Sequence, residues 1–327
     1  MVAPLGEFGR IARFLAPLAE GCPGALGLQD DGAVLTPPDG WEIAATKDML
    51  VEGVHFLPGD GPRDLARKML RVNLSDLASM GARPWVYLLS FALPKRCDDA
   101  WLAAFAEGLA MDQQEFAFSL AGGDSVSTSG PIVLDAVLLG LVERGRALRR
   151  TGAGAGEDLW LSGTLGDGAL GLLAAQGGFP TLDYVHQEAL AARYRLPQPR
   201  IALGRRLVGL ATAAMDVSDG LAADAAKLAA ASGLALEIDT PAILLSDAAA
   251  EAVAQDALLF ERVLTGGDDY ELLFTAPVEK RSEIKALTLE LDVPLARIGR
   301  ALAGEAVRLL DKDGTPLSLA QVGWVHG

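Results

Sequence analysis

The feature that most constrains the fold is an alternation, along the whole chain, between short apolar runs and longer amphipathic segments. Apolar runs of roughly four to eight residues are typical of buried strands, and apolar residues at three- and four-residue spacing indicate helices. The alternation therefore predicts a mixed α/β protein, α+β in character. We expect strands over 41–47, 85–93, 117–121, 131–142, 158–162, 234–238, 271–276 and 306–310, and helices over 6–19, 63–80, 98–113, 167–176, 199–210, 219–232 and 278–289.

The length of 327 residues predicts two domains, because single hydrophobic cores stop growing beyond roughly 250–300 residues. The stretch ERGRALRRTGAGAGE, residues 143–157, is basic and then rich in Gly and Ala, and it separates two expected strands. Such a stretch is typical of an interdomain linker. We therefore expect an N-terminal domain over 1–147 and a C-terminal domain over 148–327.

Composition excludes several classes of protein. No apolar run reaches the ~18 residues of a membrane helix, and the N-terminus lacks the separated basic and apolar regions of a signal peptide, so we expect a soluble, cytoplasmic protein. A formal charge of −15 argues against nucleic-acid and membrane-surface binding, which need basic faces. The two cysteines, Cys22 and Cys97, form no CxxC motif and indicate neither a disulfide framework nor a structural zinc site.

Many of the acidic residues lie in short frames of small residues. Glycine permits close approach of a ligand, and aspartate beside it offers a short carboxylate. With 28 Lys and Arg against 43 acids, a divalent cation would supply the missing positive charge. Oxygen ligands favour Mg²⁺ over zinc, and Mg²⁺ completes its shell with phosphate oxygens. The frames predict a metal–nucleotide site, with turns and helix caps as the alternative: QDDGA (29–33), TKD (46–48), NLSDLASMGA (73–82), AGGDS (121–125), DVSDG (216–220) and TGGDDYE (265–271).

Asp76 illustrates the prediction. It lies in a predicted helix with an apolar stripe, and Asn73 stands three residues before it on a common side. A carboxylate placed there is expected to be partly buried. Burying a charged carboxylate is costly unless it is paired or coordinates a metal.

Other chemical templates fit less well. The chain has no GxxxxGK[ST] motif, which excludes a P-loop. GDGALG, residues 166–171, matches GxGxxG, but no second strand ending in an acid follows, so a strand-to-helix turn is favoured over a dinucleotide site. Of His55, His186 and His326, only His55 is near a candidate site, and no GxSxG accompanies it. His55 is interpreted as a ligand-binding residue or a structural histidine, and not as the base of a hydrolase.

Together the frames resemble the thiamine-monophosphate kinase family. The resemblance rests on QDDGAVL, KDMLVEGVHFLP, RKMLRVNLSDLASMGARPWVYLLSFALP, AGGDS, RRTGA, PQPRIALG, MDVSDGLAADAAKLA and TGGDDYELLF, in the family's order, over nearly the whole chain. It implies transfer of the γ-phosphoryl group of ATP to thiamine monophosphate, giving thiamine diphosphate. It also implies the two-domain fold of aminoimidazole-ribonucleotide synthetase and selenophosphate synthetase, in which an N-terminal sheet pairs across a homodimer and a C-terminal α/β domain follows.

The resemblance also implies roles for individual residues. No residue acts as base or nucleophile, because the acceptor is an anionic phosphate and phosphoryl transfer needs positioning and charge stabilisation. Trp324 would stack on a flat heteroaromatic ring. The implied Mg²⁺ ligands are Asp31, Thr46, Asp48, Asp76, Asp124, Asp216 and Asp219; the ATP contacts are Gly123, Asp124, Arg150 and Ser218; the substrate contacts are His55, Asp268 and Trp324.

Three residues depart from the family pattern, one in the QDDGA frame and two in or next to the TKD frame. Gln29 stands where Gly or Thr is common, Lys47 where a Thr usually helps to hold a metal, and Met49 where a small polar residue is common. The Lys47 ammonium could replace one Mg²⁺, or the side chain could point to the other face of its strand. Two other functions therefore stay open: a related ATP-using enzyme of the same fold with another substrate, and a non-catalytic paralogue that binds nucleotide or thiamine phosphates.

Overall fold

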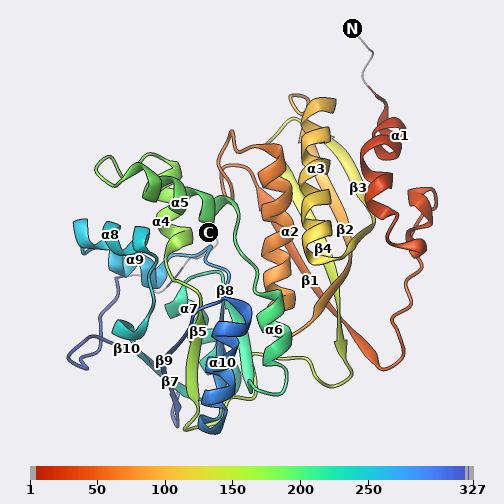
Figure 1. Ribbon diagram of the computed structural model, residues 1–327. Helices are drawn as coiled ribbons and strands as arrows, with labels where there is room; N and C mark the ends of the chain where they lie inside the picture. The colour runs from red at the N-terminus through yellow and green to blue at the C-terminus, as the bar shows by residue number, and fades with distance from the viewer. Residues whose placement is uncertain (1–4, 321–322, 324–327) are drawn as a thin grey trace. The chain divides into compact units, whose positions relative to one another are not determined.

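The computed structural model describes residues 5–320 and residue 323, and the chain divides into two compact units (Figure 1). The first unit contains the described residues up to Leu77 together with Ala82–Gly145. The second contains Ala78–Gly81 and the described residues from Arg146 onward. Helices and strands occur in both units, which confirms the predicted mixed α/β architecture. None of the described helices is long and apolar enough to cross a membrane.

The first unit is built on a four-stranded sheet in the order β1-β4-β2-β3. All neighbours are antiparallel except β2 and β3, which run parallel. Helices α2 and α3 lie against one face of this sheet (Figure 1). The elements are β1 (Trp41–Val51), α2 (Pro62–Ser79), β2 (Arg83–Pro94), α3 (Asp99–Phe116), β3 (Ser119–Thr128) and β4 (Val133–Glu143).

The N-terminal segment differs from the single helix expected over 6–19. Helix α1 (Glu7–Arg10) passes into a π-helical turn, η1 (Ile11–Leu15), and then into the 3₁₀ turn η2 (Ala16–Ala19), in which Pro17 removes a backbone donor. A further 3₁₀ segment, η3 (Pro23–Leu28), leads to the acidic QDDGA frame. The spacing of apolar residues over 6–19 is nearly the same for α-, π- and 3₁₀-helical turns, so the sequence pattern did not distinguish them.

Burial along β1 follows the two-residue repeat of a strand. Ala44 and Leu50 are buried, whereas Lys47 and Met49 are exposed. Successive side chains point to opposite faces, so Thr46 and Asp48 share the face of the buried residues. The register of this strand therefore decides which charged side chains can meet α2.

The second unit contains a six-stranded sheet in the order β10-β7-β9-β5-β8-β6. Its neighbours are antiparallel except β10 and β7. The strands are β5 (Asp158–Ser162), β6 (Ala213–Val217), β7 (Ala235–Asp239), β8 (Glu271–Ala276), β9 (Leu295–Leu302) and β10 (Val307–Leu310), and the helices are α4 (Asp167–Ala175), α5 (Tyr184–Arg195), α6 (Ile201–Leu207), α7 (Leu221–Ser232), α8 (Asp247–Gln255), α9 (Leu259–Thr265) and α10 (Arg281–Leu291), with 3₁₀ turns η4 (Thr240–Ala242) and η5 (Val278–Lys280).

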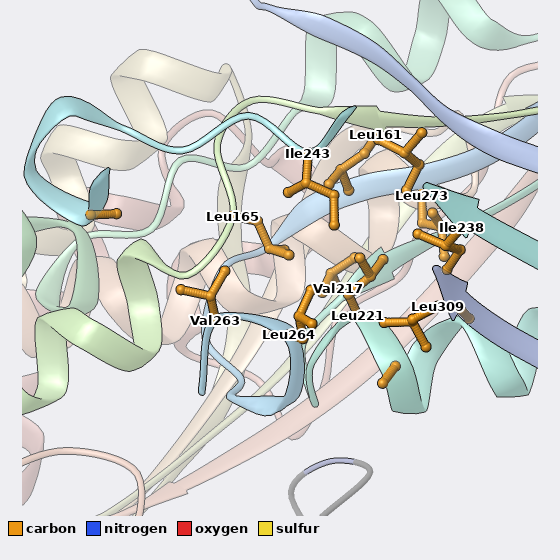
Figure 2. Close-up of a cluster of buried hydrophobic side chains, with 14 of the residues drawn as sticks. Leu161, Leu165, Val217, Leu221, Ile238, Ile243, Val263, Leu264, Leu273 and Leu309 are labelled. Atoms are coloured by element: carbon orange, nitrogen blue, oxygen red, sulfur yellow. The ribbon is translucent and has the colours of Figure 1, made fainter. Parts of the chain in front are cut away.

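Apolar clusters cover both faces of the second sheet. One joins Leu161 and Leu273 of the sheet to residues such as Leu221 and Val263 (Figure 2). The other includes Trp160 and Phe274, whose rings stack with centroids 6.4 Å apart. Strands buried on both faces read as nearly continuous apolar runs, which is why β5 and β8 were predicted at their observed bounds, 158–162 and 271–276.

Candidate functional site

In the first unit the structure brings Thr46, Asp48 and Asp76 together. Strand β1 carries Thr46 and Asp48, and α2 carries Asp76. The Thr46 hydroxyl donates to Asp76. The backbone N–H of Asp48 donates to Asn73 Oδ1 at 3.1 Å, and Asn73 Nδ2 donates to the carbonyl of Met69 at 3.0 Å. Side-chain contacts thus fix the carboxyl-bearing face of α2 against the strand.

The Asp48 and Asp76 carboxyl groups form a strongly interacting pair. The pKa of Asp48 is raised to about 7, mainly by burial and in addition by the charge of Asp76 and a hydrogen bond with it. Near neutral pH the pair is therefore ready to hold a proton. Carboxylate and hydroxyl oxygens are the ligands that Mg²⁺ prefers, so a hard cation fits these donors and would favour their charged forms.

Lys47 lies on the other face of β1. Its ammonium pairs with Asp135 of β4, and its side chain is 55% exposed. The departure from the family pattern at this position therefore does not place a cation among Thr46, Asp48 and Asp76. Of the two interpretations left open by the sequence, the outward-pointing lysine is confirmed.

Asp31 and Asp124 line a cavity of about 250 Å³ in the first unit. Asp124 lies within β3 and accepts a hydrogen bond from the Ser125 N–H at 2.8 Å. Gly123 beside it is required by close packing, because a Cβ there would lie 1.7 Å from the Leu89 carbonyl oxygen. The apolar side chains Ile11 and Leu15 form part of the opposite lining. The cavity thus combines carboxylates with an apolar wall.

The same strand continues to a second cavity of about 330 Å³. The two cavities share Glu7, Ile11, Leu15 and Ser125 in their linings. Arg10 and Lys95 line only the second cavity. We refer to the two cavities together as the N-terminal groove.

His55 occupies a turn that follows β1 directly. The Val51 N–H donates to His55 Nδ1 at 3.1 Å, so Nδ1 is an acceptor and carries no proton. In the neutral ring the proton then resides on Nε2. His55 can therefore offer an N–H donor to a ligand.

In the second unit the DVSDG frame forms the turn between β6 and α7. Asp216, at 3% exposure, is buried in β6. Asp224 of α7 accepts hydrogen bonds from the N–H groups of both Ser218 and Asp219 at 2.9 Å. Lys227 pairs with Asp219 and also with Asp224, the latter at 2.7 Å. This turn is therefore organised by donors that the chain itself supplies.

The TGGDDYE frame lies directly against that turn. The Asp268 N–H donates to the Ser218 carbonyl at 3.0 Å, and the Tyr270 N–H donates to the Val217 carbonyl at 2.8 Å. The Tyr270 hydroxyl donates to Asp268 Oδ1 at 3.1 Å. The structure thus brings together Ser218, Asp219 and Asp268, which the sequence assigned to one site.

In the part of the chain that the structure describes, no hydrogen bond or ion pair joins Arg150 to either cluster. Arg150 is exposed, and its carbonyl accepts from the Ser232 hydroxyl at 2.9 Å. Trp324 lies outside the described residues. Within residues 5–320 and 323, no three His, Cys, Asp or Glu side chains are grouped so that they could hold a metal ion. The acidic residues of the described ranges therefore do not form a closed set of three ligands in either unit.

Sequence reasoning missed three charged residues of the second unit: Asp224, Lys227 and Asp269. Asp224 falls in the first turn of α7, where an acid favours the helix N-terminus, and that position was an available signal. Lys227 stands three residues further on, a spacing that places both side chains on one helix face. Asp269 is fully buried, and its sequence neighbours gave no sign of that burial.

Comparison with known proteins identifies two family domains and similar proteins. Residues 29–142 match AIR synthase related protein, N-terminal domain, and residues 154–312 match AIR synthase related protein, C-terminal domain. A thiamine-monophosphate kinase of Caulobacter vibrioides is 41% identical over 99% of this chain and 92% of its own length.

Two solved structures are also similar. The crystal structure of thiamine-monophosphate kinase from Stenotrophomonas maltophilia K279a has a TM-score of 0.85 at 40% identity, covering 96% of this chain and 99% of its own. The structure of AaThiL complexed with AMPPCP and TMP has a TM-score of 0.78 at 30% identity and covers all of both chains. The likeness extends over both units.

Proposed function

Because the chain belongs to the thiamine-monophosphate kinase family, we propose that it transfers the γ-phosphoryl group of ATP to thiamine monophosphate, giving thiamine diphosphate and ADP. The observation that carries this proposal is the group of oxygen donors formed by the Asp48–Asp76 pair and the Thr46 hydroxyl. The similar AaThiL structure contains AMPPCP and TMP together, which correspond to an ATP analogue and the phosphate acceptor.

Phosphoryl transfer to thiamine monophosphate requires the protein mainly to position the two substrates. The acceptor is a phosphate oxygen that is already anionic, so no side chain must remove a proton from it. The chain's task is to align donor and acceptor and to offset the repulsion between their phosphates. None of the described residues assigned to the site needs to act as a nucleophile for this step.

We propose that the site binds several Mg²⁺ ions. In the first unit Asp31, Thr46, Asp48, Asp76 and Asp124 would serve as ligands, and in the second unit Asp216 would do so, with Asp219 holding a further ion. When bound, such ions would supply positive charge that stabilises the transferring phosphoryl oxygens. The protein's own contribution is to keep the carboxylates in place, as the hydrogen bonds from Thr46 to Asp76 and from the Asp48 N–H to Asn73 do.

We assign the N-terminal groove to ATP. Its apolar lining, which includes Ile11 and Leu15, suits a purine ring, and the Asp31 and Asp124 carboxylates of the same lining suit cation-bound phosphates. Gly123, Arg150 and Ser218 are proposed to contact the same nucleotide. His55, Asp268 and Trp324 are proposed to contact thiamine monophosphate, with His55 offering its Nε2–H. The use of ATP also fits the cytoplasmic location expected from the sequence.

A homodimer is part of the proposal. In β1, Ile43 and Met49 are 43% and 48% exposed on the face opposite Thr46 and Asp48. A second copy of the same sheet would cover these side chains. Sedimentation equilibrium should give a mass of two chains, and a single-chain mass at micromolar concentration would argue against the dimer.

The decisive experiment incubates the protein with ATP, Mg²⁺ and thiamine monophosphate and separates thiamine diphosphate and ADP by chromatography. Equal amounts of both products are expected. ADP formation only with another small acceptor would favour the related enzyme of the same fold. Binding of both ligands without any product would favour a non-catalytic paralogue and would overturn the kinase proposal.

A further inference from the structure

Three turns of the second unit meet around the buried side chain of Asp269. The first is Gly166–Gly168 at the start of α4, the second is the Val217–Asp219 turn, and the third is Gly267–Tyr270. Asp269 Oδ2 accepts from the Gly166 N–H and Oδ1 accepts from the Gly168 N–H, both at 2.9 Å. One carboxylate therefore uses both oxygens to join the third turn to the first.

The residues on either side of Asp269 have a costly backbone conformation. Asp268 has φ +71° and Tyr270 has φ +55°, in the left-handed region that non-glycine residues seldom adopt. Such conformations persist only where the surroundings hold them, and they concentrate at functional sites. Asp269 lies between the two and is 1% exposed.

The neighbouring turns leave little room for another arrangement. A Cβ at Gly168 would lie 2.2 Å from the Asp268 carbonyl oxygen, and one at Gly267 would lie 2.2 Å from the Ser218 carbonyl oxygen. The backbone N–H groups of Asp268 and Tyr270 bond to Ser218 and Val217 on the opposite side. The Asp268 segment is therefore held between two turns, and the Asp269 carboxylate forms the bonds on one side.

We propose that Asp269 is a positioning residue for the phosphate acceptor: its two-oxygen bond to Gly166 and Gly168 holds Asp268 in the conformation that contacts thiamine monophosphate. This inference rests on the proposed function, since it takes Asp268 as the substrate contact. Asp269 itself is buried beneath the turn, so it acts through Asp268. The effect should appear on the acceptor and not on ATP.

The chemistry of the bond defines the test. Two N–H donors need two acceptors, and asparagine offers one carbonyl oxygen and one NH₂ group. In Asp269→Asn the side-chain NH₂ group therefore faces the N–H of Gly166 or of Gly168, so that one hydrogen bond is lost. The size of the side chain stays the same. Asp167→Asn is a matched control, because Asp167 is 2% exposed in the same turn but accepts from the Thr164 and Ser246 hydroxyls, which can reverse direction. Asp167 also lies 3.8 Å from Arg193 Nε, and Arg193 keeps its closer partner Glu271 in this variant.

The experiment compares steady-state kinetics of the full-length wild type, Asp269→Asn and Asp167→Asn, with hydrogen exchange of peptides covering 163–170 and 264–272. For Asp269→Asn we expect KM for thiamine monophosphate to rise about tenfold, KM for ATP to stay within twofold, and exchange to accelerate in both peptides. Asp167→Asn should keep the wild-type KM for thiamine monophosphate. A separate variant, Tyr270→Phe, removes the hydroxyl bonded to Asp268 and should raise the same KM a few-fold.

The outcomes separate this inference from the proposed function. If the wild type forms no thiamine diphosphate, the proposed function fails before the variants are compared. If the wild type is active, an unchanged KM for thiamine monophosphate in Asp269→Asn overturns the positioning role. Equal rises of both KM values, or an equal rise in Asp167→Asn, would also overturn it, as would an Asp269→Asn protein that fails to fold while Tyr270→Phe keeps its normal KM.

Discussion

The acidic clusters of the two units neutralise their charge in different ways. In the first unit, the Asp48 and Asp76 carboxyl groups are hydrogen-bonded to each other, and the Thr46 hydroxyl donates to Asp76. The adjacent Lys47 points to the opposite face of the strand. In the second unit, Asp224 is held by two backbone N–H groups and by Lys227, which also reaches Asp219. Lys227 therefore offsets charge within the second cluster, whereas the charge of the Asp48–Asp76 pair in the first is offset by a proton or by an ion from solution.

Removing a carboxylate from the first cluster should have the largest effect on activity. Asp76→Asn replaces a charged ligand by a neutral one, and we expect kcat to fall at least about 100-fold, as for the loss of a group that stabilises transition-state charge. The measurement is turnover at saturating Mg²⁺. Asp135→Asn is the matched control on the other face of the sheet and should stay within a few-fold of wild type. Near-normal turnover of Asp76→Asn would contradict the assignment of this cluster.

The pH dependence of stability tests the proton in the first cluster. The pKa of Asp48 is about 7 in the folded protein against 3.8 for an ordinary aspartate. The folded state therefore binds more protons than the unfolded state between these values, and stability falls as pH rises through this window.

We expect the thermal midpoint to fall by roughly 5 °C between pH 5.5 and 8.5 without Mg²⁺. Saturating Mg²⁺ should reduce the fall, because a cation favours the charged carboxylates. Asp48→Asn should flatten the part of the slope that centres near pH 7. A midpoint that rises steadily with pH in metal-free buffer would show that Asp48 is not protonated in the folded chain.

The second cluster should respond to loss of its internal cation. Lys227→Gln leaves Asp224, which is fully buried, without its ammonium partner. Because Lys227 itself is 39% exposed, solvent replaces part of the interaction, and we expect a loss of about 1 kcal/mol in the free energy of unfolding. Urea denaturation measures it. A variant as stable as the wild type would remove the distinction between the clusters.

The smallest effect is expected at Lys47. Lys47→Thr restores the residue common in the family but alters an exposed ion pair, which contributes about 0–1 kcal/mol. Turnover and its Mg²⁺ dependence should match the wild type. A clear gain in Mg²⁺ affinity would mean that the lysine competes with a metal ion after all.

Much of this arrangement followed from local sequence. The sequence of β1 left open whether the Lys47 side chain lies among the acidic residues or on the other face of the strand. Its ion pair with Asp135 of β4 places it on the other face, and this contact joins residues far apart in sequence. The buried strands β5 and β8 were predicted because continuous apolar runs of that length have few alternatives.

What was missed depends on tertiary contacts. Strand β6, AAMDV, is short and contains two alanines, and β9, LARIGRAL, carries two arginines, so neither has a strong strand pattern. Helices α8 and α9 also went unpredicted. The burial of Asp269 follows from two glycines about a hundred residues earlier in the chain, a pairing that no local pattern contains.

The raised pKa of Asp48 beside Asp76 links cation binding at this pair to proton release. Loading a cation onto these carboxylates displaces the proton into the buffer, so metal binding and acid release are linked. The apparent affinity for the ion must then rise as the medium becomes more alkaline, and the measured heat of binding must change with the ionisation enthalpy of the buffer. An aspartate buried beside an aspartate would thus make binding of the proposed cation sensitive to acidity near neutral pH.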